Sequence, residues 1–497
     1  MTTPTGGPVP VRDAVPVASA PAQDDPVDDG TATADLVLPL VAVGAAAVLA
    51  GYGYLRRTRR ARTRTTPGGA EAGSAGPPYD GLDALDRQAG AALTEADDCV
   101  RASREELGFA GALHGTGAVE PFARALREAE SELAAAFRMR QRYDDGVPEE
   151  PAARRHALAG IVGRCQEAGR RLDAEAAGSD RLRGLEAGVG PALALAEARF
   201  RELTARTGTA QGALADLGTR YPPSATAPVA GAVEQAKDRL VFATSRLNLA
   251  HQAADAGDLP RAAAQLRAAE GAIAQADVLL TGVERRATAL RAAARLVPAA
   301  LTGAEAALAR ARHRVDVPAA GADLDMPVGE ARVRLRYADD VLAAVREELT
   351  GGPYDPLAAL RRIVRALAPT PAPETGVLSA AALFVARDST AAAADTVTTH
   401  RAAVGAAART RLAEAQRLLG AGPPDAPDPV AADELAGRAR ELAEQDVRLY
   451  GHPAAGAAGE ESGAAGALLG GVLLGNGPDG GPPPSFGGPD TRARRSD

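Results

Sequence analysis

The middle of the chain carries a heptad pattern of apolar residues. Eleven residues are spaced alternately by four and three positions: Ala262, Leu266, Ala269, Ile273, Ala276, Leu280, Val283, Ala287, Leu290, Ala294 and Val297. Upstream, Val233, Ala236, Leu240, Ala243, Leu247, Ala250 and Ala254 repeat the pattern. This spacing lines one face of a helix and is typical of helices that pair with an antiparallel or coiled partner. Gly257-Asp258-Leu259-Pro260 separates the two seams, so the pattern predicts a helical hairpin with Asp258 as N-cap.

Within this hairpin we expect Leu266, Ile273, Leu280 and Leu290 to pack against the Leu240–Leu247 seam. Gln275 lies off the seam and should tolerate replacement by alanine. Part of the pattern over 250–269 also matches a tetratricopeptide repeat, but the second seam is longer than the second helix of such a repeat.

Three further stretches repeat the hairpin architecture. We expect turns at 144–148, within a hairpin over 118–177, and at 351–356, where Asp355 caps a helix that starts with Pro356. In the third stretch the helix restarts at Asp428-Pro429, and the apolar pattern returns with Leu435, Leu442 and Leu449. With 3% aromatic residues and much alanine, the composition favours helices over strands. The sequence therefore predicts an all-α fold of elongated antiparallel hairpins, a coiled-coil bundle, over 80–453.

Twenty uncharged residues, 36–55, precede a cluster of arginines. A helix of that length spans about 30 Å, which matches the bilayer core. We expect a transmembrane helix over 35–55 after a disordered extracytoplasmic stub, 1–34, and before a basic juxtamembrane linker, 56–79. Because basic residues are retained inside, the N-terminus should lie outside and the C-terminal bulk should be cytoplasmic in a single-pass inner-membrane protein. A cleaved signal peptide and a buried soluble helix are the alternatives.

The arginines of the linker are the one predicted set of site residues. They should contact anionic headgroups at the membrane surface: Arg56, Arg57, Arg59, Arg60, Arg62 and Arg64. From Ala454 the chain is rich in glycine and proline, which predicts a disordered tail over 454–497.

No catalytic, cofactor-binding or metal-ligating residues are predicted. The six histidines are scattered, and no Walker loop, GxSxG or GxGxxG motif occurs in the expected context. Cys99 and Cys165 have no neighbours that suggest thiol or metal chemistry. Four adjacent acidic pairs are expected on solvated helix faces: Asp97-Asp98, Glu105-Glu106, Asp339-Asp340 and Glu347-Glu348. A net charge of −8 argues against nucleic-acid binding.

Several segments resemble the cytoplasmic half of actinobacterial TPM-domain membrane proteins. They are AFRMRQRYDDG (136–146), RYPPSATAPVAGAVEQAKDRLVFA (220–243), AGDLPRAAAQLRAAEGAIAQADVLL (256–280), GPYDPLAALRR (352–362) and SFGGPDTRARR (485–495). In that family a secreted TPM domain precedes the membrane helix, and phosphatase activity has been proposed for relatives of that domain. Only 35 residues precede the uncharged run at 36–55, too few for such a domain, so the resemblance transfers no catalytic residue. Natural absence and truncation of the TPM domain stay open.

The function expected is therefore a membrane-anchored helical scaffold or protein-interaction module. Its partners would be the lipid bilayer and other proteins, or a second copy bound through the helical seams. Two alternatives stay open. One is an envelope signalling or stress protein that relays an extracytoplasmic input, and the other is a hydrolase that uses carboxylates between helices.

Overall fold

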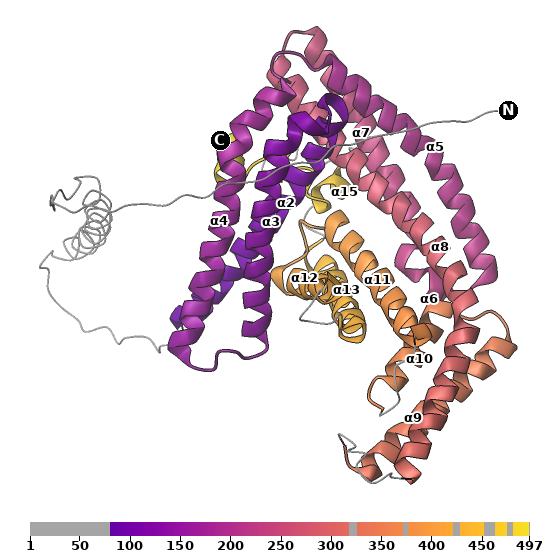
Figure 1. Ribbon diagram of the computed structural model, residues 1–497. Helices are drawn as coiled ribbons and strands as arrows, with labels where there is room; N and C mark the ends of the chain where they lie inside the picture. The colour runs from indigo at the N-terminus through magenta and orange to yellow at the C-terminus, as the bar shows by residue number, and fades with distance from the viewer. Residues whose placement is uncertain are drawn as a thin grey trace, which may run out of the picture. The chain divides into compact units, whose positions relative to one another are not determined.

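The computed structural model describes residues 80–317, 326–370, 376–420, 428–451, 463–474 and 481–496, which belong to one unit, Gly76–Asp497 (Figure 1). Every regular element in these ranges is a helix, which confirms the all-α class. In chain order they are α2 (Asp80–His114), α3 (Thr116–Asp144), α4 (Pro151–Arg183), α5 (Gly190–Arg220), α6 (Pro223–Thr226), η1 (Ala227–Val229), α7 (Ala232–Asp255), α8 (Leu259–Asp316), α9 (Val328–Gly351), α10 (Pro356–Leu367), α11 (Gly376–Thr399), α12 (Ala406–Gly420), α13 (Pro429–Tyr450), α15 (Ala464–Leu469) and α16 (Pro489–Ser496). The predicted stub, transmembrane helix and linker lie outside the described residues.

The hairpin predicted from the two seams is formed by α7 and α8, which run side by side (Figure 1). Gly257 has a φ of 76°, a conformation that glycine adopts without steric cost. The carboxylate of Asp258 accepts a hydrogen bond from the backbone N–H of Arg261 at 3.2 Å and so caps α8. Every seam residue is buried except Ala254 and Ala294, which are half-buried.

The long helix α8 changes partners partway along its length. With 58 residues it extends about 87 Å. Up to Val283 its apolar stripe shares a core with α5 and α7, and from Ala287 onward it shares a second core with α9, α10 and α11. The prediction that Leu290 packs against Leu240–Leu247 is therefore wrong. Because α7 has only 24 residues, antiparallel pairing from the turn ends near Val283, and Leu290 is buried in the second core.

The other predicted turns are confirmed. α3 ends at Asp144 and α4 begins at Pro151, and α2 completes a three-helix bundle with them. The Asp355 carboxylate accepts from the backbone N–H groups of Leu357 and Ala358 at 3.0 Å, and Asp428 caps α13 in the same way. Of the leucines predicted on α13, Leu435 and Leu442 are half-buried against hydrophobic cores, whereas Leu449 is 61% exposed. The buried stripe consists of small residues that allow close helix approach: Ala432, Ala436, Ala439 and Ala443.

Among the described residues, one helix, α11, has the length and composition to cross a membrane. Core helices of soluble proteins meet the same criteria, and α11 packs against α8, α12 and α13. It also carries Asp388 and Asp395, which pair with arginines of α8. These contacts place α11 in the helical bundle.

The prediction that 454–497 is a disordered tail is wrong for 463–474 and 481–496. α15 packs against α7, and α16 packs against α4 and α2 (Figure 1). Val472, Leu473 and Phe486 are each buried in the hydrophobic cores. The glycines permit this close approach, because a Cβ added at Gly466 would collide with the Arg239 guanidinium.

The docked tail also corrects the expectation for Gln275. Its side chain is fully buried because the tail covers the face of α8 that lies off the seam. Gln275 Oε1 accepts from Arg239 Nε at 2.9 Å, and its Nε2 donates to the carbonyl oxygen of Gly470. Removing this amide would leave a buried guanidinium and a buried carbonyl short of a partner.

Two substitutions test this packing. Leu280→Ala should lower the free energy of unfolding by about 2–5 kcal/mol, because it opens a cavity in the core between α7 and α8.

Gln275→Ala should lower the free energy of unfolding by about 1–3 kcal/mol, because the buried hydrogen bonds of this amide are lost. Denaturant unfolding of the full chain in detergent measures both, with Gln252→Ala on the exposed side of α7 as control. A Gln275→Ala chain as stable as this control would contradict the docked position of the tail.

Candidate functional site

The residues predicted to contact the membrane surface, Arg56 to Arg64, lie outside the described residues. In the described ranges, no group of three or more His, Cys, Asp and Glu side chains is arranged to hold a metal ion. His114, His156, His251 and His313 are exposed. The polar side chains of the described residues are found instead in buried ion pairs and in the walls of two cavities, of about 320 and 400 Å³.

Asp97-Asp98, predicted to be solvated, holds a buried arginine. Arg409 is 1% exposed and donates to Asp97 Oδ2 at 2.6 Å and to Asp98 Oδ1 at 2.7 Å. It also donates to the carbonyl oxygen of Arg401 at 2.6 Å. The prediction fails because α12 covers this face of α2, so the carboxylates become partners of an arginine 312 positions later in the chain.

Glu105-Glu106 is likewise not on a solvated face. Arg401 forms a two-pronged pair with the Glu105 carboxylate, at 2.7 and 3.1 Å. Glu106 accepts from Arg267 Nε at 3.1 Å and lies close to Arg183. Arg183 in turn pairs with Glu270 of α8. Glu347-Glu348 is exposed as predicted, and Asp340 is exposed while Asp339 is half-buried.

The pKa values of these carboxyls follow their surroundings. Burial by itself would raise the pKa of Asp97, but Arg101 and Arg409 outweigh it and hold that pKa at about 2. Burial opposes the charge on Glu106 too, and the adjacent Arg267 and Arg183 lower its pKa. For Glu270, burial prevails over the guanidinium groups of Arg183 and Arg267 and raises the pKa. The pKa values of Glu106 and Glu270, which both lie beside Arg183, are thus shifted in opposite directions. Such opposite shifts are found in structural ion-pair networks and in active sites alike.

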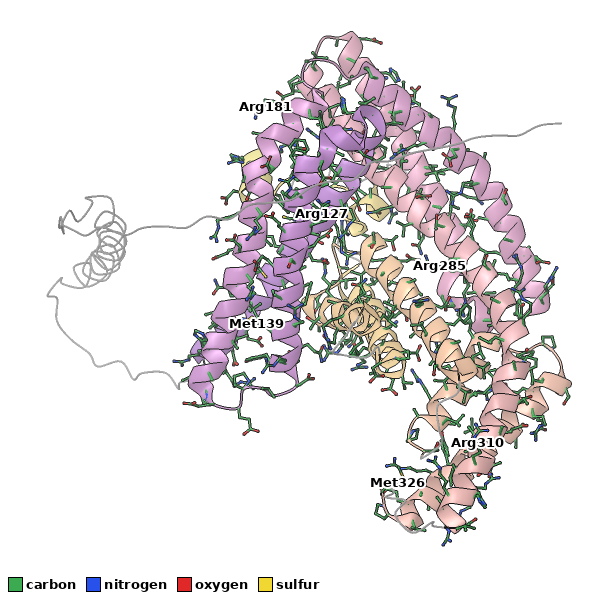
Figure 2. The ribbon with its side chains drawn as sticks, in the orientation of Figure 1. Arg127, Met139, Arg181, Arg285, Arg310 and Met326 are labelled. Carbon is green, nitrogen blue, oxygen red and sulfur yellow. The ribbon has the colours of Figure 1, made fainter. Side chains whose placement is uncertain are left out.

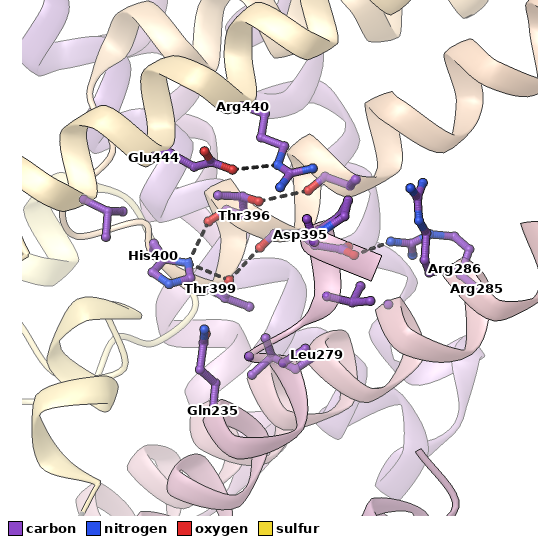
Figure 3. A pocket seen from close by; sticks show the side chains of 18 of the residues that line it. Gln235, Leu279, Arg285, Arg286, Asp395, Thr396, Thr399, His400, Arg440 and Glu444 are labelled. Carbon is purple, nitrogen blue, oxygen red and sulfur yellow. Dashed lines mark hydrogen bonds and ion pairs between the residues drawn. The ribbon is translucent and has the colours of Figure 1, made fainter. Parts of the chain in front are cut away.

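A polar cavity of about 320 Å³ lies where η1, α8, α11 and α13 meet (Figure 3). Arg285, on the side of α8 toward α11 in Figure 2, pairs with Asp395. Arg286 donates to Asp388 at 2.7 Å and to the carbonyl oxygen of Ala225 at 2.8 Å. Within α13, Arg440 donates to Glu444 at 2.8 Å. Each of these three arginines is therefore held by a carboxylate of the cavity wall.

His400 is the one imidazole on this cavity. Its Nδ1 lies 2.9 Å from Thr399 Oγ1 and 3.2 Å from the carbonyl oxygen of Thr396 (Figure 3). Burial lowers the pKa of His400 and raises that of Asp395, despite the Arg285 guanidinium beside that carboxyl. The cavity therefore combines paired charges with a neutral histidine.

The residues of this cavity form no motif in the sequence. Asp388 and Asp395 are seven residues apart, which places both on one face of α11. Arg285 and Arg286 face them from α8. The i, i+7 spacing was available as a signal, but nothing in the sequence indicates that these two helices are neighbours.

Cys99 and Cys165 are both buried free thiols. Burial raises the pKa of each to about 12. At neutral pH they are therefore protonated and poor nucleophiles.

Two curated proteins of Mycobacterium tuberculosis are similar to this chain: UPF0603 protein MT2410 of strain CDC 1551 / Oshkosh and UPF0603 protein Rv2345 of strain ATCC 25618 / H37Rv. Each is 32% identical over 416 residues, which cover 80% of this chain. The match spans 62% of the length of each relative. No family model and no solved structure matches the chain.

The Asp97 pair predicts a pH-dependent loss of stability. Because its pKa falls from 3.8 to about 2 on folding, the ionised carboxylate stabilises the fold by about 2 kcal/mol above pH 4. That contribution disappears as the pH falls through about 2. The stability difference between wild type and Asp97→Asn, measured by unfolding of the full chain, should therefore be constant from pH 7 to about pH 5 and narrow as the pH falls from about 4 toward about 2. The same change at exposed Asp340 should have little effect, and a gap for Asp97→Asn that is independent of pH would contradict the assignment.

Proposed function

We propose that this chain is a membrane-anchored helical scaffold, the cytoplasmic part of a single-pass protein of TPM type, that binds other proteins through its outer faces. The observation that carries the proposal is that buried arginines are paired with carboxylates of other helices. Arg183, Arg401 and Arg409 each pair with carboxylates from a distant helix. Arginines and carboxylates that pair with each other in the interior fix the positions of their helices. Their charges are then not available to bind a substrate.

The polar cavity supports the same proposal. A hydrolase that uses carboxylates between helices needs at least one carboxylate free to take or give a proton. Asp388 and Asp395 instead accept from Arg286 and Arg285, and Glu444 accepts from Arg440. These pairs favour a structural role for the cavity wall over acid–base catalysis.

Partner binding would use surfaces other than the two seams. The seams of α7 and α8 pack against each other within one chain, and this pairing occupies them. Val333 and Tyr337 lie one turn apart on α9 and are 59% and 62% exposed. Exposed apolar residues at this spacing form a stripe that a partner helix can cover.

Membership in the TPM type is part of the proposal. It is supported by the similarity to the two UPF0603 proteins together with the quoted segments, all of which lie among the described residues. The segment 256–280 forms the turn and first half of α8, and 485–495 forms the docked end of the tail.

The membrane topology can be tested with cysteine labelling. Because Cys99 and Cys165 are buried with a pKa of about 12, the two native thiols should react little with a maleimide and leave the label to an introduced cysteine. In intact cells, an impermeant maleimide should label a Ser19→Cys chain and leave a Ser74→Cys chain unlabelled until the membrane is opened. The reverse pattern would overturn the orientation, and wild type is the control for background.

Partner binding can be tested with the same chemistry. A Tyr337→Cys chain carrying a benzophenone maleimide should give, on irradiation in native membranes, an adduct of one defined mass with another polypeptide. Val333→Asp, one turn away, should abolish that adduct by placing a charge in the contact. A Val241→Cys chain, labelled on an exposed position of α7, is the matched control. The proposed contact would be contradicted if the Tyr337→Cys chain gave no adduct, or if Val333→Asp left the yield of the adduct unchanged.

A further inference from the structure

The C-terminal segment 481–496 lies against α2 and α4 in the manner of a bound peptide. One carboxylate, that of Asp173 on α4, receives most of its polar contacts. Asp173 Oδ1 accepts from the backbone N–H of Gly488 at 2.8 Å, and from the backbone N–H and the hydroxyl of Thr491 at 2.9 and 2.6 Å. Asp173 therefore caps the first turn of α16 from a different helix.

Two side chains of α2 receive the residues just before this turn. The backbone N–H of Phe486 donates to the Glu106 carboxylate, and that of Gly487 donates to Ser103 Oγ at 3.2 Å. Ser103 and Glu106 are both buried, so neither is left to water. Ser103, Glu106 and Asp173 thus accept from three successive backbone amides, those of Phe486, Gly487 and Gly488.

An aromatic anchor fixes the segment in this register. Phe486 is 1% exposed, and its ring centroid lies 6.0 Å from that of Phe122 in an edge-to-face arrangement. It belongs to the same hydrophobic core as Leu93 and Leu172 of the three-helix bundle. Burial of one aromatic side chain in a pocket is typical of the residue that dominates peptide affinity.

The glycines beside Phe486 make the fit selective. Gly487 has a φ of 146°, and a Cβ there would lie 2.6 Å from Thr491 Cβ. A Cβ on Gly488 would collide with the backbone of Gly169 in α4. In turn, a Cβ on Gly169 would lie 2.6 Å from Pro489 Cδ. Glycine at 487 and 488 thus fits where any larger residue would collide, and Gly169 leaves room for the ring of Pro489.

We infer that α2 and α4 form a peptide-binding site specific for the segment 481–496, filled by the chain's own tail and open to the same segment of a second copy when that tail is displaced. The determinants lie within the segment itself: the Phe486 anchor, the two glycines, Thr491 and the Arg495–Asp180 ion pair. The covalent link between the segment and the rest of the chain therefore raises the local concentration of the segment at the site but does not determine its specificity. The inference rests on the tail contacts alone and is independent of membrane attachment.

The test uses a fluorescein-labelled synthetic peptide of residues 481–497 and the full chain in detergent. A chain with Phe486→Ala and Gly488→Ala in its own tail keeps its groove but holds the tail weakly. Its fluorescence-anisotropy titration should show saturable binding. Wild type should bind the peptide about tenfold or more weakly, because its own tail competes. A peptide with Phe486→Ala has the same charge and should not bind. Adding Asp173→Ala to the double variant should remove binding of the unchanged peptide.

Two results would overturn the inference: no binding by the double variant, or equal binding of both peptides, which would indicate charge attraction only. If the double variant fails to fold, a second chain serves, with a protease site inserted between Gly475 and Gly480 and the groove and tail unchanged. After cleavage, labelled peptide should replace the released segment and co-elute with the chain on gel filtration. Loss of the segment without uptake of the probe would equally overturn the inference.

Discussion

The apolar stripe of α8 is the constraint on which the described fold depends. Its first half is covered by α5 and α7 and its second half by α9, α10 and α11, so one helix belongs to both large cores. Much of this stripe is alanine, which buries little area for each residue but lets helix axes approach closely. The length of α7 then decides where one core ends, because α8 must find new partners beyond the last residue that α7 can reach. The position of α9–α11 follows from this mismatch in helix length.

Alanine-rich faces fit one another in many ways, so such a core does not by itself specify which helices meet. The buried ion pairs supply a specific match, because a guanidinium left without its carboxylate in a mismatched packing is costly. Arg409 joins α12 to α2 through Asp97, and Arg286 joins α8 to α11 through Asp388. Arginine suits this role, since its planar fork stays charged and binds carboxylates through two parallel hydrogen bonds. The sequence contains a single lysine, Lys237, and the described cations that pair in the interior are arginines.

The features predictable from the sequence are those encoded locally. Asp258 and Asp355 cap helices whose start is marked by the next few residues, and the seams follow from the spacing of apolar positions. The buried polar sites depend on partners far away in the chain. Glu105 meets Arg401 across 296 positions, and Gln275 meets Gly470 across 195. Along its own helix an adjacent acidic pair has the pattern of a solvated face, and only the covering helix makes it interior. The cavity was missed for the same reason, since Asp395 and Arg285 become a pair only when α11 packs on α8.

The tail shows why composition is a poor guide to order in a segment that binds through its backbone. Glycine and proline predict disorder because they provide little apolar surface to offset the entropy lost on ordering. Between 481 and 496 that deficit is met by one aromatic anchor and by carboxylates that receive backbone amides. The glycines are then a requirement, because a side chain at Gly488 would collide with α4. The information that orders the segment is divided between its own residues and Ser103, Glu106 and Asp173, which lie more than 300 positions earlier in the chain. Order in such a tail is therefore a property of the groove as much as of the tail, and a window of sequence that contains only one of them cannot reveal it.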